Sequence, residues 1–347
     1  MVEQEANVAR EADVAQEADV AREADVAREA VTEPAAEKRA RKRWSLSASM
    51  LVVGLVGVLV FAGGAVAGFI IGAGGAAAAS DRGNDLRVKT GELVLFDGPV
   101  SATAYLPAGA NTFRVDTKDV RGHTVLLLQL PNGVAISRFL TDVMSISAGK
   151  TPDEADQRKY EKVNRGGARV LPKCSIAFTV TLEAGTYYLV DFRGLGISDP
   201  TPRVQEVRVT GEAPDAALPA HEAELVMDDS HGAAHYHASS TKWRSGQPIL
   251  VSNRASDPLE AVILQLKPGI TDAQVREFFT PDYPDWQNSP FGGGACGLAP
   301  LASGRQAVAR YYTPPAHYTL TSFTLDPKSQ KRQYQQEMLQ RVTVLAL

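Results

Sequence analysis

The pattern of apolar and polar positions divides the chain into three parts. Residues 49–72 are apolar and hold no charged side chain, and a membrane-spanning helix needs about 20 such residues. In the preceding residues 1–44, apolar positions form no continuous stripe. After residue 84, short runs rich in β-formers alternate with Gly and Pro turns, which is typical of antiparallel sandwiches or barrels. Four such runs are 92–96, 125–128, 177–182 and 187–190.

The flanks of the apolar run predict its orientation. Residues 38–43 carry five cations, followed by Trp44, and positive residues stay in the cytoplasm while Trp favours the headgroup level. We therefore expect residues 45–72 to be a signal anchor that contacts the lipid bilayer through 49–72, with everything after it outside the cell membrane. Small residues at 76–79 leave cleavage open as an alternative. Gly64, Gly68 and Gly72 lie four apart and permit a homodimer through close helix packing.

The N-terminal tail, residues 1–44, is built from hexapeptides that begin at Glu5 and end near residue 31. A period of six advances about 240° around a helix, so Val8, Val14 and Val20 point in different directions. With no apolar face to bury, we expect a disordered cytoplasmic tail. A linker rich in Gly and Ala, residues 73–87, follows the anchor.

Charge argues against nucleic acid as a partner. Residues 1–37 hold eleven acids and three bases, whereas the chain after Trp44 holds 28 bases and 29 acids. A nucleic-acid binder shows a basic face or a strongly basic domain, and the outer region is close to neutral.

The outer region resembles itself. Segments recur in the same order at offsets between 127 and 136 residues, which predicts two copies of one domain, residues 88–211 and 221–347. The matched pairs are 128–134 with 264–270, 166–168 with 293–295, 187–192 with 318–323, and 205–209 with 340–344.

Two short helices interrupt the strands. One opens at Thr151, with Pro152 at the first helical position and Glu154 three residues after the cap. The other opens at Thr271, has Gln274 in the capping-box position and runs through Phe279. Both openings follow the Ser/Thr-x-x-Glu/Gln signature of a helix N-terminus.

The order of parts in each copy resembles a cupredoxin-type β-sandwich of secreted bacterial proteins. The resemblance implies that copper-binding members use an early His, a Cys and a second His, with a weak Met ligand. Here the first copy keeps His123, and Asp191 stands in the place of the Cys. In the second copy Leu259 and Ser322 hold the matching places. The resemblance therefore implies the fold without the copper ligands, and no cofactor is expected.

The two cysteines, Cys174 and Cys296, leave their pairing open. Outside the membrane they can form one disulfide, which would join the two domains. The alternative is two separate buried thiols, because geometry decides the pairing.

Two other clusters carry candidate chemistry. His231, His235 and His237 lie beside Asp228, and imidazoles at alternate strand positions point the same way, so they form a candidate metal site; the alternative is an exposed polar segment. An acidic aromatic loop, residues 282–286, suits sugar binding or glycoside chemistry.

We expect a mainly β protein of two tandem sandwiches with a non-enzymatic binding or structural role at the envelope. Its partner is an extracytoplasmic protein or a cell-wall component. The alternatives are an envelope metal-binding or metal-sensing protein that uses the histidine cluster, and an enzyme acting on cell-wall glycan.

Overall fold

The computed structural model describes residues 86–91, 93–96, 103–147, 160–194, 202–212, 216–280 and 288–346. All of them belong to one compact unit. The predicted cytoplasmic tail, the anchor with its three glycines and nearly all of the linker lie outside the described residues. Within the described part, no helix combines the length and apolar character needed to span a membrane.

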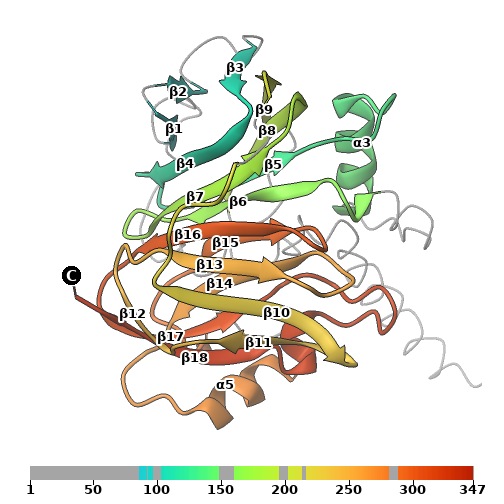
Figure 1. Cartoon of the computed structure of the whole chain (residues 1–347). Coiled ribbons are helices and arrows are strands. Elements are labelled where there is room, and N and C mark those ends of the chain that lie inside the picture. The colour runs from blue at the N-terminus through green and yellow to red at the C-terminus, as the bar shows by residue number, and fades with distance from the viewer. Residues whose placement is uncertain are drawn as a thin grey trace, which may run out of the picture. The chain divides into compact units, whose positions relative to one another are not determined.

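The fold consists of two β-sheets (Figure 1). The first has eight strands. In spatial order they are β11 (Ala233–Ala238), β10 (Ala223–His231), β13 (Ile249–Asn253), β16 (Gln306–Tyr312), β7 (Ser175–Leu182), β4 (Gly109–Thr117), β1 (Leu86–Thr90) and β2 (Leu93–Leu95).

The second sheet has ten strands. In spatial order they are β12 (Lys242–Arg244), β18 (Leu339–Leu345), β17 (Ala316–Thr321), β14 (Leu259–Gln265), β15 (Cys296–Leu301), β6 (Asn164–Val170), β5 (His123–Leu128), β8 (Gly185–Arg193), β9 (Arg203–Thr210) and β3 (Ala104–Pro107). The predicted runs 125–128, 177–182 and 187–190 lie in β5, β7 and β8, and the run 92–96 contains β2.

Both sheets pass through both halves of the chain. Counted from the outer edge to the middle of the eight-stranded sheet, the first half contributes β2, β1, β4 and β7. Counted in the same way from the opposite edge, the second half contributes β11, β10, β13 and β16. The halves meet where β7 pairs with β16 and β6 pairs with β15, both antiparallel. The regions predicted as 88–211 and 221–347 therefore share two continuous sheets; the boundaries themselves stay predictions.

Alternating side chains place the core between the sheets. In β4 every second residue is buried, from Gly109 to Thr117, as expected for a strand with one face on a core. The central strand β5 is buried at all six positions, because helix α3 (Ile136–Ser147) packs on its outer face through Phe139 and Val143. Strands of this kind read as continuous apolar runs.

Helix α5 (Asp272–Phe279) covers the second half in the same way, with Val275 and Phe279 in its own apolar cluster beside the short 3-10 helix η3 (Gln333–Gln336). The predicted capping box is confirmed, since Thr271 Oγ1 accepts from the Gln274 amide. The predicted opening at Thr151 lies outside the described residues. Helix α3 follows Ala135, which has no capping oxygen, so its start carried no sequence signal.

Two glycines allow strands to approach closely. Leu126 pairs with Gly167 in the first half, and Val262 pairs with Gly297 in the second. A Cβ at Gly297 would lie 2.4 Å from the Ala261 carbonyl oxygen. The sheet register therefore matches Gly167 with Gly297, three residues beyond the Gly294 that the sequence repeat aligns with Gly167.

The disulfide between Cys174 and Cys296 settles the pairing that the sequence left open. Cys174 lies between β6 and β7, and Cys296 begins β15. The bond joins the two halves where their sheets meet, with a Cα–Cα distance of 6.3 Å, within the usual range for a disulfide.

Candidate functional site

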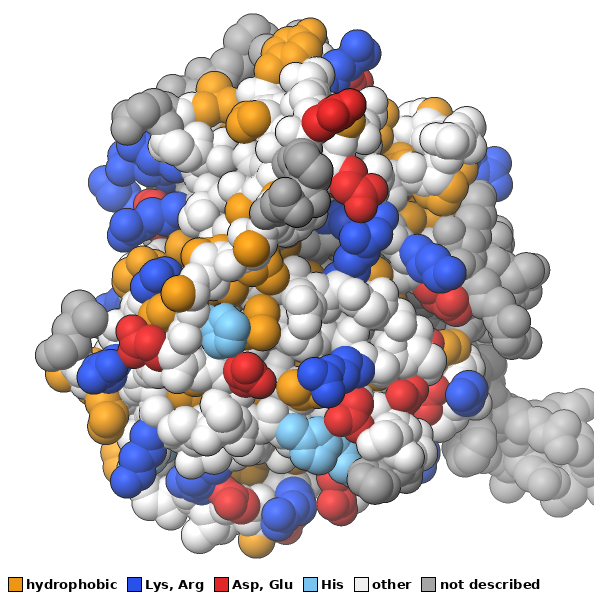
Figure 2. Space-filling model, viewed as in Figure 1, with side chains coloured by type: hydrophobic (Ala, Val, Ile, Leu, Met, Phe, Trp, Pro, Cys, Tyr) orange, Lys and Arg blue, Asp and Glu red, His pale blue; other side chains and the backbone are white. Residues whose placement is uncertain are grey.

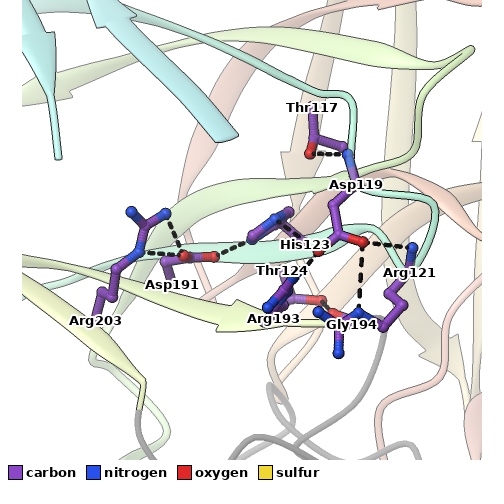
Figure 3. Close-up of polar contacts among 9 residues, drawn as sticks. All are labelled: Thr117, Asp119, Arg121, His123, Thr124, Asp191, Arg193, Gly194 and Arg203. Atoms are coloured by element: carbon purple, nitrogen blue, oxygen red, sulfur yellow. Dashed lines mark hydrogen bonds and ion pairs between the residues drawn. The ribbon is translucent and has the colours of Figure 1, made fainter. Parts of the chain in front are cut away.

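The most concentrated buried polar group of the first half lies at one end of its interior (Figure 3). His123 begins β5 and Asp191 lies on β8, opposite Val125 in the sheet register. Val125 belongs to the main core. Cross-strand neighbours and residues two apart on a strand share a face, so His123 and Asp191 both point between the two sheets.

His123 lies between two carboxylates. Its Nδ1 donates a hydrogen bond to Asp191 Oδ1 at 2.8 Å. Its Nε2 lies 3.8 Å from Asp119 Oδ2 and makes no hydrogen bond within the described part of the chain. The His123 residue is only 4% exposed, so the ring is held inside the protein. The second ring nitrogen therefore faces a carboxylate at a distance too long for a hydrogen bond.

Arg203 on β9 occupies the other oxygen of Asp191. Its Nε and Nη2 donate to Asp191 Oδ2 at 2.9 and 2.7 Å, and its guanidinium lies 5.1 Å from the centroid of the Phe96 ring. The charge of the buried Asp191 carboxylate is compensated because Arg203 pairs with it and both Arg203 and His123 donate hydrogen bonds to it. Both carboxylate oxygens of Asp191 are therefore engaged.

Asp119 anchors the loop between β4 and β5. Its Oδ2 accepts from Arg193 Nε at 2.5 Å, and its Oδ1 accepts from the Arg121 amide at 3.0 Å. Its own amide donates to Thr117 Oγ1. Figure 3 shows these contacts continuing from the His123–Asp191 pair to Arg121. The network ties the β4–β5 loop to strands β8 and β9.

The second half replaces this network with a different one. At the places that match His123 and Asp191 lie Leu259 and Ser322, both buried. Ser322 Oγ accepts from the Glu260 amide at 3.3 Å, and Glu260 is paired with Arg169 of the first half. Each matching end is thus occupied by buried protein groups that contact one another, although His123 Nε2 makes no hydrogen bond.

The residues at these two ends do not fit the copper ion that copper-binding members of the resembled family hold. A blue-copper site needs a thiolate together with imidazole. The chain has two cysteines, and both are in the disulfide. Asp191, in the place of the Cys, is already engaged by His123 and Arg203.

The predicted cluster of His231, His235 and His237 stays a prediction. His231 ends β10 and its side chain lies outside the described residues, while His235 and His237 lie on the edge strand β11. His237 Nε2 lies 3.2 Å from Asp228 Oδ2, and His235 lies opposite Asp228 in the register. Among the described side chains, no three His, Cys, Asp or Glu residues gather as a metal site.

Sequence reasoning found His123 and Asp191 but missed Asp119, Arg193 and Arg203. The spacing of Asp191 and Arg193, two apart on one strand, signals a shared face. Nothing local in the sequence indicates that Arg203 lies beside Asp191, since their pairing depends on the β8–β9 register. The predicted sugar-binding loop 282–286 lies outside the described residues.

Comparison with known proteins gives distant similarities. No protein-family model matches the chain, and no curated protein matches its sequence. Among solved structures, auracyanin from Roseiflexus castenholzii is 17% identical, with 35% of this chain and 94% of that chain covered and a TM-score of 0.22. Lac15 from a marine microbial metagenome is 13% identical, with 71% of this chain and 58% of that chain covered and a TM-score of 0.18.

The laccase-like multicopper oxidase CueO from Ochrobactrum sp. is 9% identical, with 71% of this chain and 58% of that chain covered and a TM-score of 0.20. The chain therefore spans less than two thirds of the length of Lac15 and of this oxidase. At such identities and TM-scores, these matches are similarities that assign no family and no activity.

Proposed function

We propose that this chain is a copper-free double β-sandwich protein that acts outside the cell membrane by binding a partner, without enzymatic activity. The observation that carries the proposal is the use of both cysteines in the disulfide between the halves, which leaves the chain without a thiolate. The fold then serves as a scaffold, and sandwiches present edges and loops that bind partners without catalytic residues.

The disulfide also supports the location. Disulfides persist in oxidising compartments and are rare in the cytosol. The predicted anchor at 45–72, with five cations on its N-terminal side, supports the same location for residues 86–346. The predicted anchor and the disulfide are independent grounds for this part of the proposal.

Copper titration of the full chain, purified from membranes, tests the copper-free part of the proposal. After addition of Cu(II) and removal of free metal, we expect no bound copper at the first-half site and no charge-transfer band of a copper–thiolate bond. The matched variant is His123→Ala. Stoichiometric copper in the parent protein that disappears in His123→Ala contradicts the proposal.

A reporter fused to the carboxyl end tests the location separately. We expect a periplasmic or extracellular reporter, such as alkaline phosphatase, to be active, and a cytosolic reporter to be inactive. Activity of the cytosolic reporter alone contradicts the proposed topology.

A further inference from the structure

One outward face of the ten-stranded sheet carries an exposed aromatic and charged surface in the first half. On β3, Ala104 and Leu106 are buried while Tyr105, between them, is 64% exposed. On β9, Val207 and Val209 are buried while Glu206 and Arg208 face outward. On β8, Tyr188 lies between the buried Tyr187 and Leu189, faces the same side and is partly buried against the apolar cluster beside helix α3.

The sheet register places these four side chains in two adjoining rows. Tyr105 pairs with Arg208 across β3 and β9, and Glu206 pairs with Tyr188 across β9 and β8. Directly opposed residues have Cβ atoms about 5 Å apart. Arg208 Nε donates to Glu206 Oε1 at 2.8 Å, so the ion pair lies between the two tyrosines. In Figure 2, hydrophobic and charged side chains adjoin at the end where Figure 1 places β3 and β9.

The second half shows that the fold itself does not need this surface. The same register there places Lys242, Thr343, Arg341 and Thr319 at the positions of Tyr105, Arg208, Glu206 and Tyr188. Arg341 Nε is paired with Asp272 of helix α5 at 2.5 Å. Neither tyrosine has a counterpart, and the strand order is unchanged. The rings of Tyr105 and Tyr188 are therefore present in the first half alone, although both halves have the same strand order.

The charge balance of the surface selects the kind of ligand. Arg208 and Glu206 compensate each other, so the patch attracts neither an anion nor a cation strongly. Together they still offer several donors and acceptors. Tyrosine rings present an apolar face with a polar tip. Flat apolar rings beside a neutral donor–acceptor pair match a sugar ring, which has apolar C–H faces and a rim of hydroxyls.

We propose that Tyr105, Tyr188, Glu206 and Arg208 form a binding surface for a neutral polysaccharide chain. Sugar rings lie against the tyrosines, and their hydroxyls bond to the Arg208–Glu206 pair. This inference rests on the proposed function, because it names the partner that the scaffold binds outside the membrane.

The test measures binding of the full chain, in detergent, to three neutral probes: chitotetraose, dextran and mannan. We expect saturable binding to at least one probe. Tyr105→Ala then weakens binding by about ten-fold, the size expected for one aromatic contact. Tyr188→Thr, which restores the residue of the second half, weakens it similarly. Lys242→Ala, at the position that matches Tyr105, leaves affinity unchanged within about two-fold.

Melting temperatures check that the variants fold: Tyr105 is exposed, so its removal opens no cavity, whereas Tyr188 is partly buried beside helix α3 and its removal is expected to lower the melting temperature slightly. Tyr105→Ala therefore decides the inference. Absence of binding to all three probes overturns the inference, as does equal binding by Tyr105→Ala. Capture of a protein at this surface, with no glycan bound, also overturns it. Failure here is distinct from failure of the proposed function, which the copper titration and the reporter fusions measure without any glycan.

Discussion

Arg169 and Glu260 form a buried ion pair across the junction between the two halves. Arg169 Nη2 lies 2.5 Å from Glu260 Oε1, and the two residues are 2% and 0% exposed. Glu260 Oε2 also accepts from the Phe323 amide. Burial raises the pKa of Glu260, and the Arg169 charge opposes that rise. The pair lies at the centre of the ten-stranded sheet, where β15 joins β6 to β14.

Glu260→Gln is expected to lower the free energy of unfolding by about 3–5 kcal/mol, because it leaves the Arg169 charge buried without its partner. The double variant Arg169→Met, Glu260→Leu is expected to recover much of this loss, since apolar groups of similar volume need no compensation. Urea unfolding measures both. Glu222→Gln, in the exposed pair with Arg244, is the control and should cost at most about 1 kcal/mol. Equal losses in Glu222→Gln and Glu260→Gln would contradict this account.

Replacing Cys174 and Cys296 together by Ser is expected to lower stability by about 4 kcal/mol. The bond closes a separation of 122 residues, and closing a long loop restricts the unfolded chain. Denaturant midpoints of the parent protein with and without reductant check the same quantity. A midpoint that does not change on reduction would show that sheet pairing alone holds the halves together.

Asp191→Asn is expected to destabilise the protein by about 2–4 kcal/mol, because Arg203 loses the carboxylate that accepts two of its hydrogen bonds. The effect is structural and should appear in urea unfolding without any change in copper content. Asp142→Asn, which also loses contacts to Arg138 at the surface of α3, is a milder comparison. A loss no greater than that of Asp142→Asn would count against a central role for Asp191.

Asp257 gives the folded protein a defined pH dependence. Its pKa is raised from 3.8 to about 6, chiefly by burial and then by the nearby Asp326, Glu161 and Asp229, while Lys328 opposes the rise. Between these two pKa values the folded state binds a proton that the unfolded chain releases. The contribution of Asp257 to stability is therefore greatest below about pH 4, falls as pH rises towards about 6, and then levels off.

The variant Asp257→Asn removes this dependence. At neutral pH it is expected to be more stable than the parent by about 1 kcal/mol, a value reduced for solvent screening at a half-buried site. Near pH 4 the two should be equal. Thermal unfolding of both proteins across this range checks the sign, and a parent protein that gains stability relative to the variant as pH rises contradicts it.

Gly297→Ala is expected to cost about 3 kcal/mol or more, because its backbone has a φ of +154° and a Cβ there would meet the Ala261 carbonyl and the Val262 Cα. Gly293→Ala is the matched control, since its nearest contact is Gln265 Oε1 at 3.9 Å, and it should change stability by less than about 0.5 kcal/mol. Calorimetry distinguishes the two. A loss in Gly293→Ala as large as that in Gly297→Ala would contradict this account.

Features that depend on local patterns could be predicted from the sequence. Short runs of β-forming residues between Gly and Pro turns located β5, β7 and β8, and the Thr271–Gln274 capping box located the start of α5. At the candidate site, the family resemblance drew attention to His123 and Asp191. Helix α3 escaped prediction because Ala135 provides no cap.

The sequence by itself determined where most predicted strands run and that the chain carries two cysteines, because period-two alternation and composition are local properties. Only the tertiary structure decided that both sheets continue through the two halves, that Cys174 meets Cys296, and that Arg203 joins Asp191. Each of these depends on which strand edges pair and in which register. Register couples residues far apart in the chain, and side-chain alternation leaves the choice of partner strand open.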